Sequence, residues 1–257
     1  MNKLALILIV ASIALSSLIT YQITQSGPVG LSDEYVKKEN LKKYFDEYVD
    51  QGSDVIYASL VKAIEQQKQA DEKKKQQALI DHKEELENDP LTPFLGNEKG
   101  DVNIVMFSDY QCGYCKKSAP ILSRMLQKDT GLKLILKEYP VLGQASLISA
   151  KAALAAFKLD KAKYAVFNQQ LFKRSLRSEN DLLAIAKAAD INGLALLAEM
   201  KKPEYVQQLQ KNQTLGSKLG INGTPAFIID NVLYAGALPE AQLLEIIKTV
   251  REKRSVK

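Results

Sequence analysis

The chain has 257 residues, of which 46% are hydrophobic and 25% charged, so it can bury one sizeable core and an appendage. Its two cysteines stand in a single motif, and His82 is the only histidine, which excludes a structural zinc site and a histidine-dependent hydrolase. The net charge is +5, but basic residues are not interleaved with aromatic residues, so we expect no nucleic-acid partner.

The first 24 residues have the pattern of an export signal. Lys3 precedes an apolar run from Leu4 to Thr20, as in the charged and apolar regions of a secretory signal. The run only reaches the lower length limit of a membrane span, so residues 1–24 are either a cleaved signal peptide or a retained membrane anchor. Both alternatives place the rest of the chain outside the cytosol, where an oxidising environment suits a thiol catalyst.

Residues 32–88 are expected to form an N-terminal α-helical segment. Apolar residues recur at three- and four-residue spacing over 35–49 and again over 55–64, which predicts two amphipathic helices separated at Gly52. Beyond residue 64 the helix-forming composition continues but the apolar stripe ends, as in a solvated spacer.

The apolar faces within residues 32–64 need a partner surface. We expect them to meet the same faces of other copies and form a homo-oligomer, a dimer or a trimer. The alternative is that they fold back on their own catalytic domain. The long charged spacer favours the oligomer.

Residues 89–257 are expected to form an α/β catalytic domain, which begins after Asn88-Asp89-Pro90. A strand, a helix and a second strand come first and predict a parallel pair with a right-handed crossover. Four helices follow, with Ser146 and Ser178 as the expected N-caps of two of them, and then a hairpin with an Asp230-Asn231 turn and a last helix. The expected strands are Val102–Phe107, Leu132–Tyr139, 226–229 and 232–234, and the expected helices are 112–127, 146–158, 161–175, 179–190, 202–218 and 239–254.

The two cysteines open the first of these helices, in Phe107-Ser108-Asp109-Tyr110-Gln111-Cys112-Gly113-Tyr114-Cys115. A Cys-x-x-Cys at the junction of a strand and a helix is typical of a redox-active dithiol. Free amides and the positive end of the helix dipole favour a thiolate at Cys112, and only a thiolate attacks a disulfide. Cys115, one turn further on, can close on Cys112.

Together with Glu138-Tyr139-Pro140 and Gly223-Thr224-Pro225-Ala226, this motif resembles the DsbA/DsbC-like bacterial thiol-disulfide oxidoreductases of the thioredoxin superfamily. The resemblance implies a thioredoxin-like fold with an inserted helical subdomain, and a cis Pro225 beside the dithiol with Thr224 on the substrate side. It further implies exported protein substrates, a membrane redox partner, no cofactor and a periplasmic location in a Gram-negative bacterium, with inner-membrane anchoring if the signal is retained.

The dipeptide Gly113-Tyr114 lacks the histidine of the strongest oxidases in that family and resembles the isomerases, and both residues are candidate substrate contacts. Met106 stands where some relatives carry a buried acid. Proton transfer would then need Glu138 or Asp109, although either could be an ordinary carboxylate at a strand end.

Tyr110 lines the substrate groove or belongs to the edge of the core.

From the dithiol and the resemblance we expect a protein disulfide oxidoreductase that acts as an isomerase or in both directions. A dedicated dithiol oxidase is the second alternative. A Cu(I)-binding Cys-x-x-Cys module and a structural protein with a vestigial dithiol are the non-enzymatic alternatives.

Overall fold

The computed structural model describes residues 38–174 and 176–255, so the expected signal or anchor at residues 1–24 lies outside the described part. The chain divides into two compact units, one ending at Gln67 and one beginning at Lys68. Across the described ranges, none of the helices combines the length and the apolar character that crossing a membrane requires.

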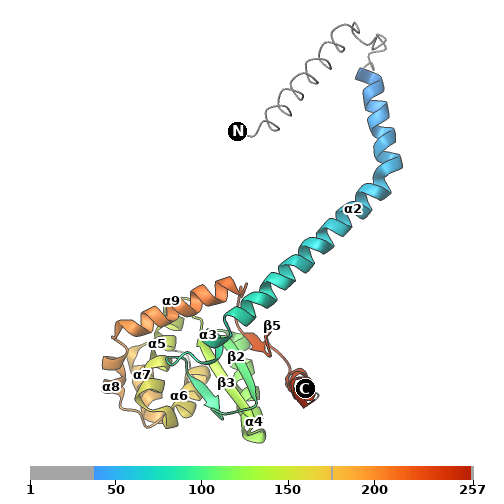
Figure 1. The fold of residues 1–257 in the computed structure, drawn as a ribbon. Coiled ribbons are helices and arrows are strands. Elements are labelled where there is room, and N and C mark those ends of the chain that lie inside the picture. The colour runs from blue at the N-terminus through green and yellow to red at the C-terminus, as the bar shows by residue number, and fades with distance from the viewer. Residues whose placement is uncertain (1–37, 175, 256–257) are drawn as a thin grey trace, which may run out of the picture. The chain divides into compact units, whose positions relative to one another are not determined.

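The helix α2 (Lys38–Asp81) is continuous over 44 residues, so the expected break at Gly52 is wrong (Figure 1). A single glycine costs a helix only about 1 kcal/mol relative to alanine, and strong helix formers on both sides outweigh it. A short helix, α3 (Lys83–Glu87), follows after His82. The residues expected to form a spacer are therefore helical as far as Glu87.

The unit that begins at Lys68 is built on a five-stranded sheet of order β1-β3-β2-β4-β5. Its strands are β1 (Phe94–Gly96), β2 (Val102–Ser108), β3 (Leu132–Glu138), β4 (Ala226–Ile229) and β5 (Val232–Ala235). The strands β2 and β3 are parallel and are joined through α4 (Gly113–Lys128), as expected. The β4–β5 hairpin also forms as expected, and both turn residues, Asp230 and Asn231, have positive φ. The three-residue β1, antiparallel to β3, was not expected.

Five helices, one more than expected, stand between β3 and β4 and form the inserted helical subdomain. They are α5 (Gln144–Leu159), α6 (Lys161–Lys173), α7 (Glu179–Ala188), α8 (Gly193–Glu199) and α9 (Pro203–Lys218), and α10 (Glu240–Ser255) ends the fold. Ser178 caps α7 in a capping box, as expected. Ser146 does not cap α5, since Gly143 holds that position and Ser146 is buried inside the first turn. Asn192 caps α8, the helix that was not expected.

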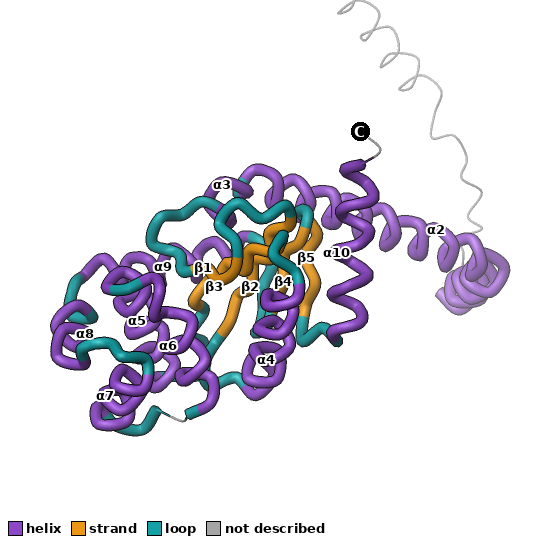
Figure 2. Tube along the Cα trace, turned by 90° about the horizontal axis from the view of Figure 1, so that it is seen from below, coloured by secondary structure: helices purple, strands orange, loops and turns teal. Residues whose placement is uncertain are grey.

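The sheet separates two hydrophobic cores, because successive strand residues point to opposite faces. One face carries Ile104, Met106, Leu134 and Leu136 and packs against α4, α10 and the helical insert. The other face packs against α9, α3 and the end of α2, which lie together on that side of the sheet (Figure 2).

Two leucines of the N-terminal segment belong to this second core. Leu79 in α2 is 3% exposed and Leu86 in α3 is 2% exposed. The end of α2 and α3 therefore share a core with the sheet, within the unit that begins at Lys68.

Candidate active site

The dithiol lies at the N-terminus of α4. Cys112 is the N-cap residue, with the extended φ of −73° and ψ of 121° that leaves the first amides of the helix pointing outward. Its carbonyl accepts from the Lys116 amide, 3.0 Å away, so the helix begins directly behind the sulfur. Cys112 is 9% exposed and Cys115 is completely buried, and the two sulfurs are not joined in a disulfide. Only Cys112 presents a sulfur to a large substrate.

The loop before β4 faces this sulfur. The Thr224–Pro225 peptide bond is cis, and the Cys112 thiol donates a hydrogen bond of 3.2 Å to the Thr224 carbonyl oxygen. The Pro225 carbonyl in turn accepts from the Gly236 amide, which ties the loop to the far end of the hairpin. Residues more than a hundred positions apart are thus brought together at the dithiol, as the resemblance implied.

The two thiols differ in their acidity. Burial opposes ionisation of Cys112, but hydrogen bonds from the Thr224 side chain and from the Cys115 and Tyr114 amides outweigh it and lower the pKa of Cys112. Burial raises the pKa of Cys115 to about 12, and the neighbouring Cys112 adds to this rise. Cys112 is therefore the sulfur that ionises first, and Cys115 is held as a thiol.

Asp109 holds the approach to the dithiol in shape. One carboxylate oxygen accepts from the Gln111 amide at 2.8 Å, and the other accepts from the amides of Val141 and Leu142 at 2.8 and 3.0 Å. Because three amides occupy both oxygens, the carboxylate anchors the loop after β3 to the motif. These contacts favour a positioning role for Asp109 over the expected proton transfer.

Glu138 and Tyr110 form a buried polar cluster behind the motif. The Tyr110 hydroxyl lies 3.0 Å from Glu138 Oε1 and 2.8 Å from Asn168 Oδ1, and all three side chains are buried. Burial raises the pKa of Glu138 well above its usual value, and the hydrogen bond from Tyr110 only partly opposes this. Among the described residues, Glu138 Oε2 has no hydrogen-bond partner. The Tyr110 hydroxyl has only one hydrogen, so it cannot donate to both neighbours at once. If Glu138 is neutral, its carboxyl proton can be donated to the Tyr110 oxygen while Tyr110 donates to Asn168 Oδ1.

The other residues expected at the site differ in how exposed they are. Tyr110 is 1% exposed, so it belongs to the core and does not line a groove. Tyr114 is 64% exposed, and Gly113 has open space where a side chain would stand. His82 pairs with Glu85 at 3.1 Å in α3, and no contact of His82 involves the motif. Within the described ranges, no three His, Cys, Asp or Glu side chains gather as metal ligands.

Two members of the site's surroundings were not expected from the sequence. Asn168 comes from α6, and its contact with Tyr110 depends on how the helical insert packs. Ser149 in α5 accepts a long hydrogen bond of 3.4 Å from Gln111, next to Cys112. Neither residue carries a local sequence signal, because each acquires its role only through a contact distant in sequence.

A family model described as "Thioredoxin" matches residues 88–249. The chain is 24% identical over 167 residues to disulfide bond formation protein D of Bacillus subtilis, which covers 61% of this chain and 75% of that protein.

Two solved structures are similar in fold. A linker-deletion mutant of Proteus mirabilis ScsC is 27% identical with a TM-score of 0.68, covering 79% of this chain and 95% of that one. The thiol-disulfide exchange protein alpha-DsbA2 of Wolbachia pipientis is 30% identical with a TM-score of 0.64, covering 71% of this chain and 97% of that one. With the cis Thr224–Pro225 bond beside the Cys112–Cys115 pair, these matches show that the chain belongs to the thioredoxin family, as a DsbA-like thiol-disulfide oxidoreductase.

Proposed function

We propose that this protein isomerises or introduces disulfide bonds in exported proteins through Cys112 and Cys115. The difference between the two sulfurs carries the proposal. One is reachable and has a lowered pKa, while the other is fully buried and has a pKa raised to about 12. Stepwise thiol–disulfide exchange uses one thiolate that attacks the substrate and a second thiol that later attacks the mixed disulfide. The more exposed Cys112 and the fully buried Cys115 fit these two roles.

In the isomerase direction the Cys112 thiolate attacks one sulfur of a substrate disulfide. The substrate bond breaks, a mixed disulfide forms, and the other substrate sulfur leaves as a thiolate. That thiolate attacks a different disulfide of the same substrate, and a later attack on the mixed disulfide returns Cys112 as a thiolate. No net oxidation or reduction occurs in this cycle.

Net transfer needs the second sulfur. When Cys115 loses its proton and attacks Cys112, the substrate leaves as a dithiol and the Cys112–Cys115 disulfide forms, so two electrons pass to the substrate. The reverse sequence oxidises a substrate dithiol. A membrane redox partner would reduce or oxidise the pair after each turnover and so set the direction.

Exposed apolar side chains surround the nucleophile and suit an unfolded polypeptide. Tyr114 is 64% exposed, and Val141 and Leu142 are 46% and 56% exposed in the loop that Asp109 anchors. The backbone beside Pro225 can pair with an extended substrate segment while these side chains contact its apolar residues. Thr224, Gly113 and Tyr114 are then the substrate contacts.

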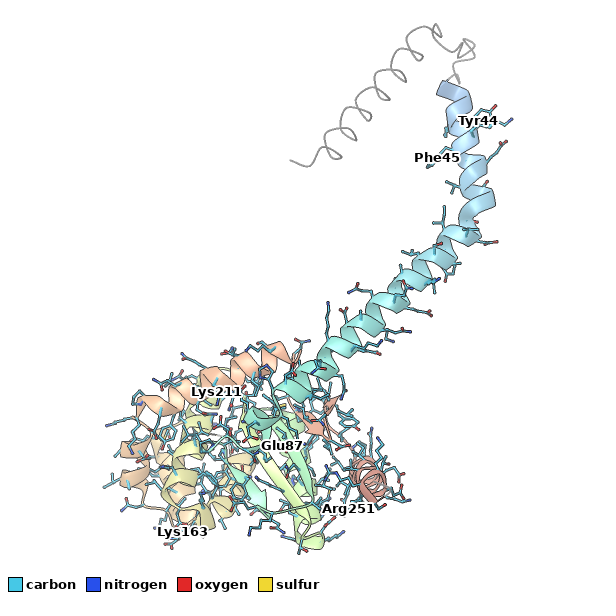
Figure 3. The ribbon with its side chains drawn as sticks, viewed as in Figure 1. Tyr44, Phe45, Glu87, Lys163, Lys211 and Arg251 are labelled. Carbon is cyan, nitrogen blue, oxygen red and sulfur yellow. The ribbon has the colours of Figure 1, made fainter. Side chains whose placement is uncertain are left out.

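The apolar stripe of α2 supports assembly into a homo-oligomer. Phe45, Val49, Ile56, Leu60 and Ile64 are 37–66% exposed, and at 100° per residue they fall within about 100° of arc, the width of an interface stripe. Figure 3 shows the side chains of Tyr44 and Phe45 projecting from this helix. Joining several catalytic units through residues 32–64 would present several dithiols to one misfolded client, which favours isomerisation over a dedicated oxidase.

An oxidising compartment completes the proposal. The apolar run over residues 4–20 would export the chain, either as a cleaved signal or as an inner-membrane anchor, to the periplasm of a Gram-negative cell. Cys112 and Cys115 are the only cysteines, so the exported chain has no thiol that could mispair.

Refolding of scrambled, disulfide-bonded ribonuclease tests the activity. We expect the reduced, purified protein to restore ribonuclease activity and Cys112→Ser to restore none above the uncatalysed rate. Cys115→Ser is the matched control: it should form mixed disulfides but release substrate slowly. Tight Cu(I) uptake without any refolding would instead support the copper-binding alternative, and neither activity would support a vestigial dithiol.

Sedimentation velocity tests the assembly. The intact chain should sediment as a dimer or trimer, and a chain lacking residues 32–64 should sediment as a monomer. Equal numbers of chains per particle before and after the deletion would contradict the role of the α2 stripe.

A further inference from the structure

A pocket that neither cysteine lines is found between α4 and α6. Its volume is about 340 Å³, which falls at the lower end of the usual range of ligand pockets, about 300–1,000 Å³. Met106, Leu134 and Leu136 form its floor on the sheet, and neither Cys112 nor Cys115 lines it. The two helices that wall it pack side by side over the sheet (Figure 2).

The walls of this pocket are apolar below and basic at the edge. Leu122 and Leu126 of α4 face Phe172 of α6 across it, whereas Lys116 and Lys173 are its only charged lining residues. No carboxylate lines it. Neither lysine forms an ion pair within the described part of the chain.

The charged residues of the two wall helices are all basic, although Arg124, Lys128 and Lys163 pair with acidic residues outside these helices. The sequence of α4 contains four Lys or Arg residues and that of α6 contains three, and neither helix contains an Asp or a Glu. The lining also contains four uncharged polar residues, Ser123, Gln127, Asn168 and Gln169. A mainly apolar pocket whose charged lining residues are all positive is complementary to a molecule with an apolar chain and a single anionic head.

We propose that this pocket binds a single-chain carboxylate amphiphile, a fatty-acid anion. Its chain lies over the floor formed by Met106, Leu134 and Leu136, and its carboxylate lies between Lys116 and Lys173. The site is independent of disulfide exchange, so it goes beyond the function proposed above.

Isothermal titration of the full-length protein with dodecanoate, below its micelle-forming concentration, tests this site. We expect saturable binding of one molecule per chain. Dodecan-1-ol has the same chain without the charge and should bind more weakly. Replacing both rim cations, by Lys116→Gln with Lys173→Gln, should weaken dodecanoate about three- to tenfold, the usual scale for losing two exposed ion pairs, and should leave dodecan-1-ol unchanged.

Two further variants separate this pocket from other apolar surfaces of the chain. Ser123→Phe places a ring into the pocket and should abolish binding, while Lys117→Gln changes the same charge one residue outside the lining and should not. Unfolding curves of each variant confirm that it is folded. Absence of saturable binding, or binding that survives Ser123→Phe in a folded protein, as it would at the exposed stripe of α2, would overturn the proposal.

Discussion

Lys137 and Glu138 are neighbours at the end of β3, yet they serve opposite faces of the sheet. Lys137 is completely buried on the face covered by α3, where its ammonium donates to the Glu85 carbonyl at 2.7 Å and to Thr92 Oγ1 at 2.9 Å. Glu138 is completely buried on the face of the dithiol, where Tyr110 is its side-chain partner.

The comparison shows how this fold separates stability from chemistry. On the α3 face the Lys137 ammonium contacts the Glu85 carbonyl and Thr92 Oγ1, and Asp89 lies 4.0 Å away, so this charge links α3 and the loop after it to the sheet. Both faces carry groups with shifted pKa values: burial lowers the pKa of Lys137 to about 8 on the α3 face and raises the pKa of Glu138 on the dithiol face. Only the dithiol face also holds the nucleophile, Cys112. Substitutions on the α3 face should lower the free energy of unfolding and leave the reactivity of Cys112 unchanged, whereas substitutions at the dithiol should change that reactivity.

The largest expected effect is the difference in reactivity between the two sulfurs of the dithiol face. With a pKa of about 12, Cys115 has a thiolate fraction of about 10⁻⁵ at pH 7, whereas the lowered pKa of Cys112 keeps a far larger fraction ionised. Iodoacetamide at pH 7 should therefore modify Cys112 at least about a hundredfold faster than Cys115. Mass spectrometry of peptides over time measures both rates.

Cys112→Ser is the control for this experiment, because it exposes Cys115 to the reagent without a competing thiol. Alkylation of Cys115 in that variant should remain slow at pH 7, because burial, the largest cause of its raised pKa, is still present. Similar rates for the two cysteines would contradict the assignment of nucleophile and resolving thiol.

On the α3 face, Leu86→Ala should lower the free energy of unfolding by about 2–5 kcal/mol, because it leaves a cavity in the second core. Urea denaturation of the reduced protein measures this. The alkylation rate of Cys112 should stay unchanged. Leu194→Ala removes the same atoms from a side chain that is 76% exposed and should cost no more than about 0.5 kcal/mol.

Glu138→Gln should change how stability depends on pH. The folded protein holds the Glu138 proton above the pKa of the unfolded chain, so the wild type should lose stability as the pH rises from about 4.3 towards the raised pKa. The variant carries no proton to lose and should lack this part of the pH dependence. Urea denaturation of both proteins at pH 5 and pH 8 measures the difference, and parallel pH profiles would show that Glu138 titrates normally.

Thr224→Val should have the smallest effect. It removes the Thr224 side-chain hydrogen bond that helps to lower the pKa of Cys112, so that pKa should rise. The pH dependence of the Cys112 alkylation rate gives the value. Thr224→Ser keeps the hydroxyl and should behave as the wild type; an equal shift in both variants would indicate an effect of packing alone.

The dithiol, the hairpin turn and one helix cap could be predicted from sequence because their signals are local. Cys112-Gly113-Tyr114-Cys115 opens a helix, Asp230-Asn231 makes a two-residue turn, and Ser178 caps α7. Each depends on a few adjacent residues whose backbone preferences do not need the rest of the fold.

The α3 face could not be predicted, because its contacts join segments far apart in the sequence. Lys137 looked like an ordinary strand residue, and it is buried only because Glu85 and Thr92 cover it. The strand β1 is too short to be recognised without its partner β3. Gly52 was expected to end a helix because glycine disfavours helix interiors. The strong helix formers on both sides outweigh this cost, so α2 continues through it.

The complete burial of Cys115 has a consequence for timing. In the proposed cycle, burial that disfavours ionisation of Cys115 would slow its attack on the mixed disulfide, so each client would remain attached longer before it is released. During that dwell the client's own freed sulfur can try one pairing after another. Slow release by the buried Cys115 would thus give a client more time to rearrange its disulfides, which suits an isomerase better than a rapid dithiol oxidase.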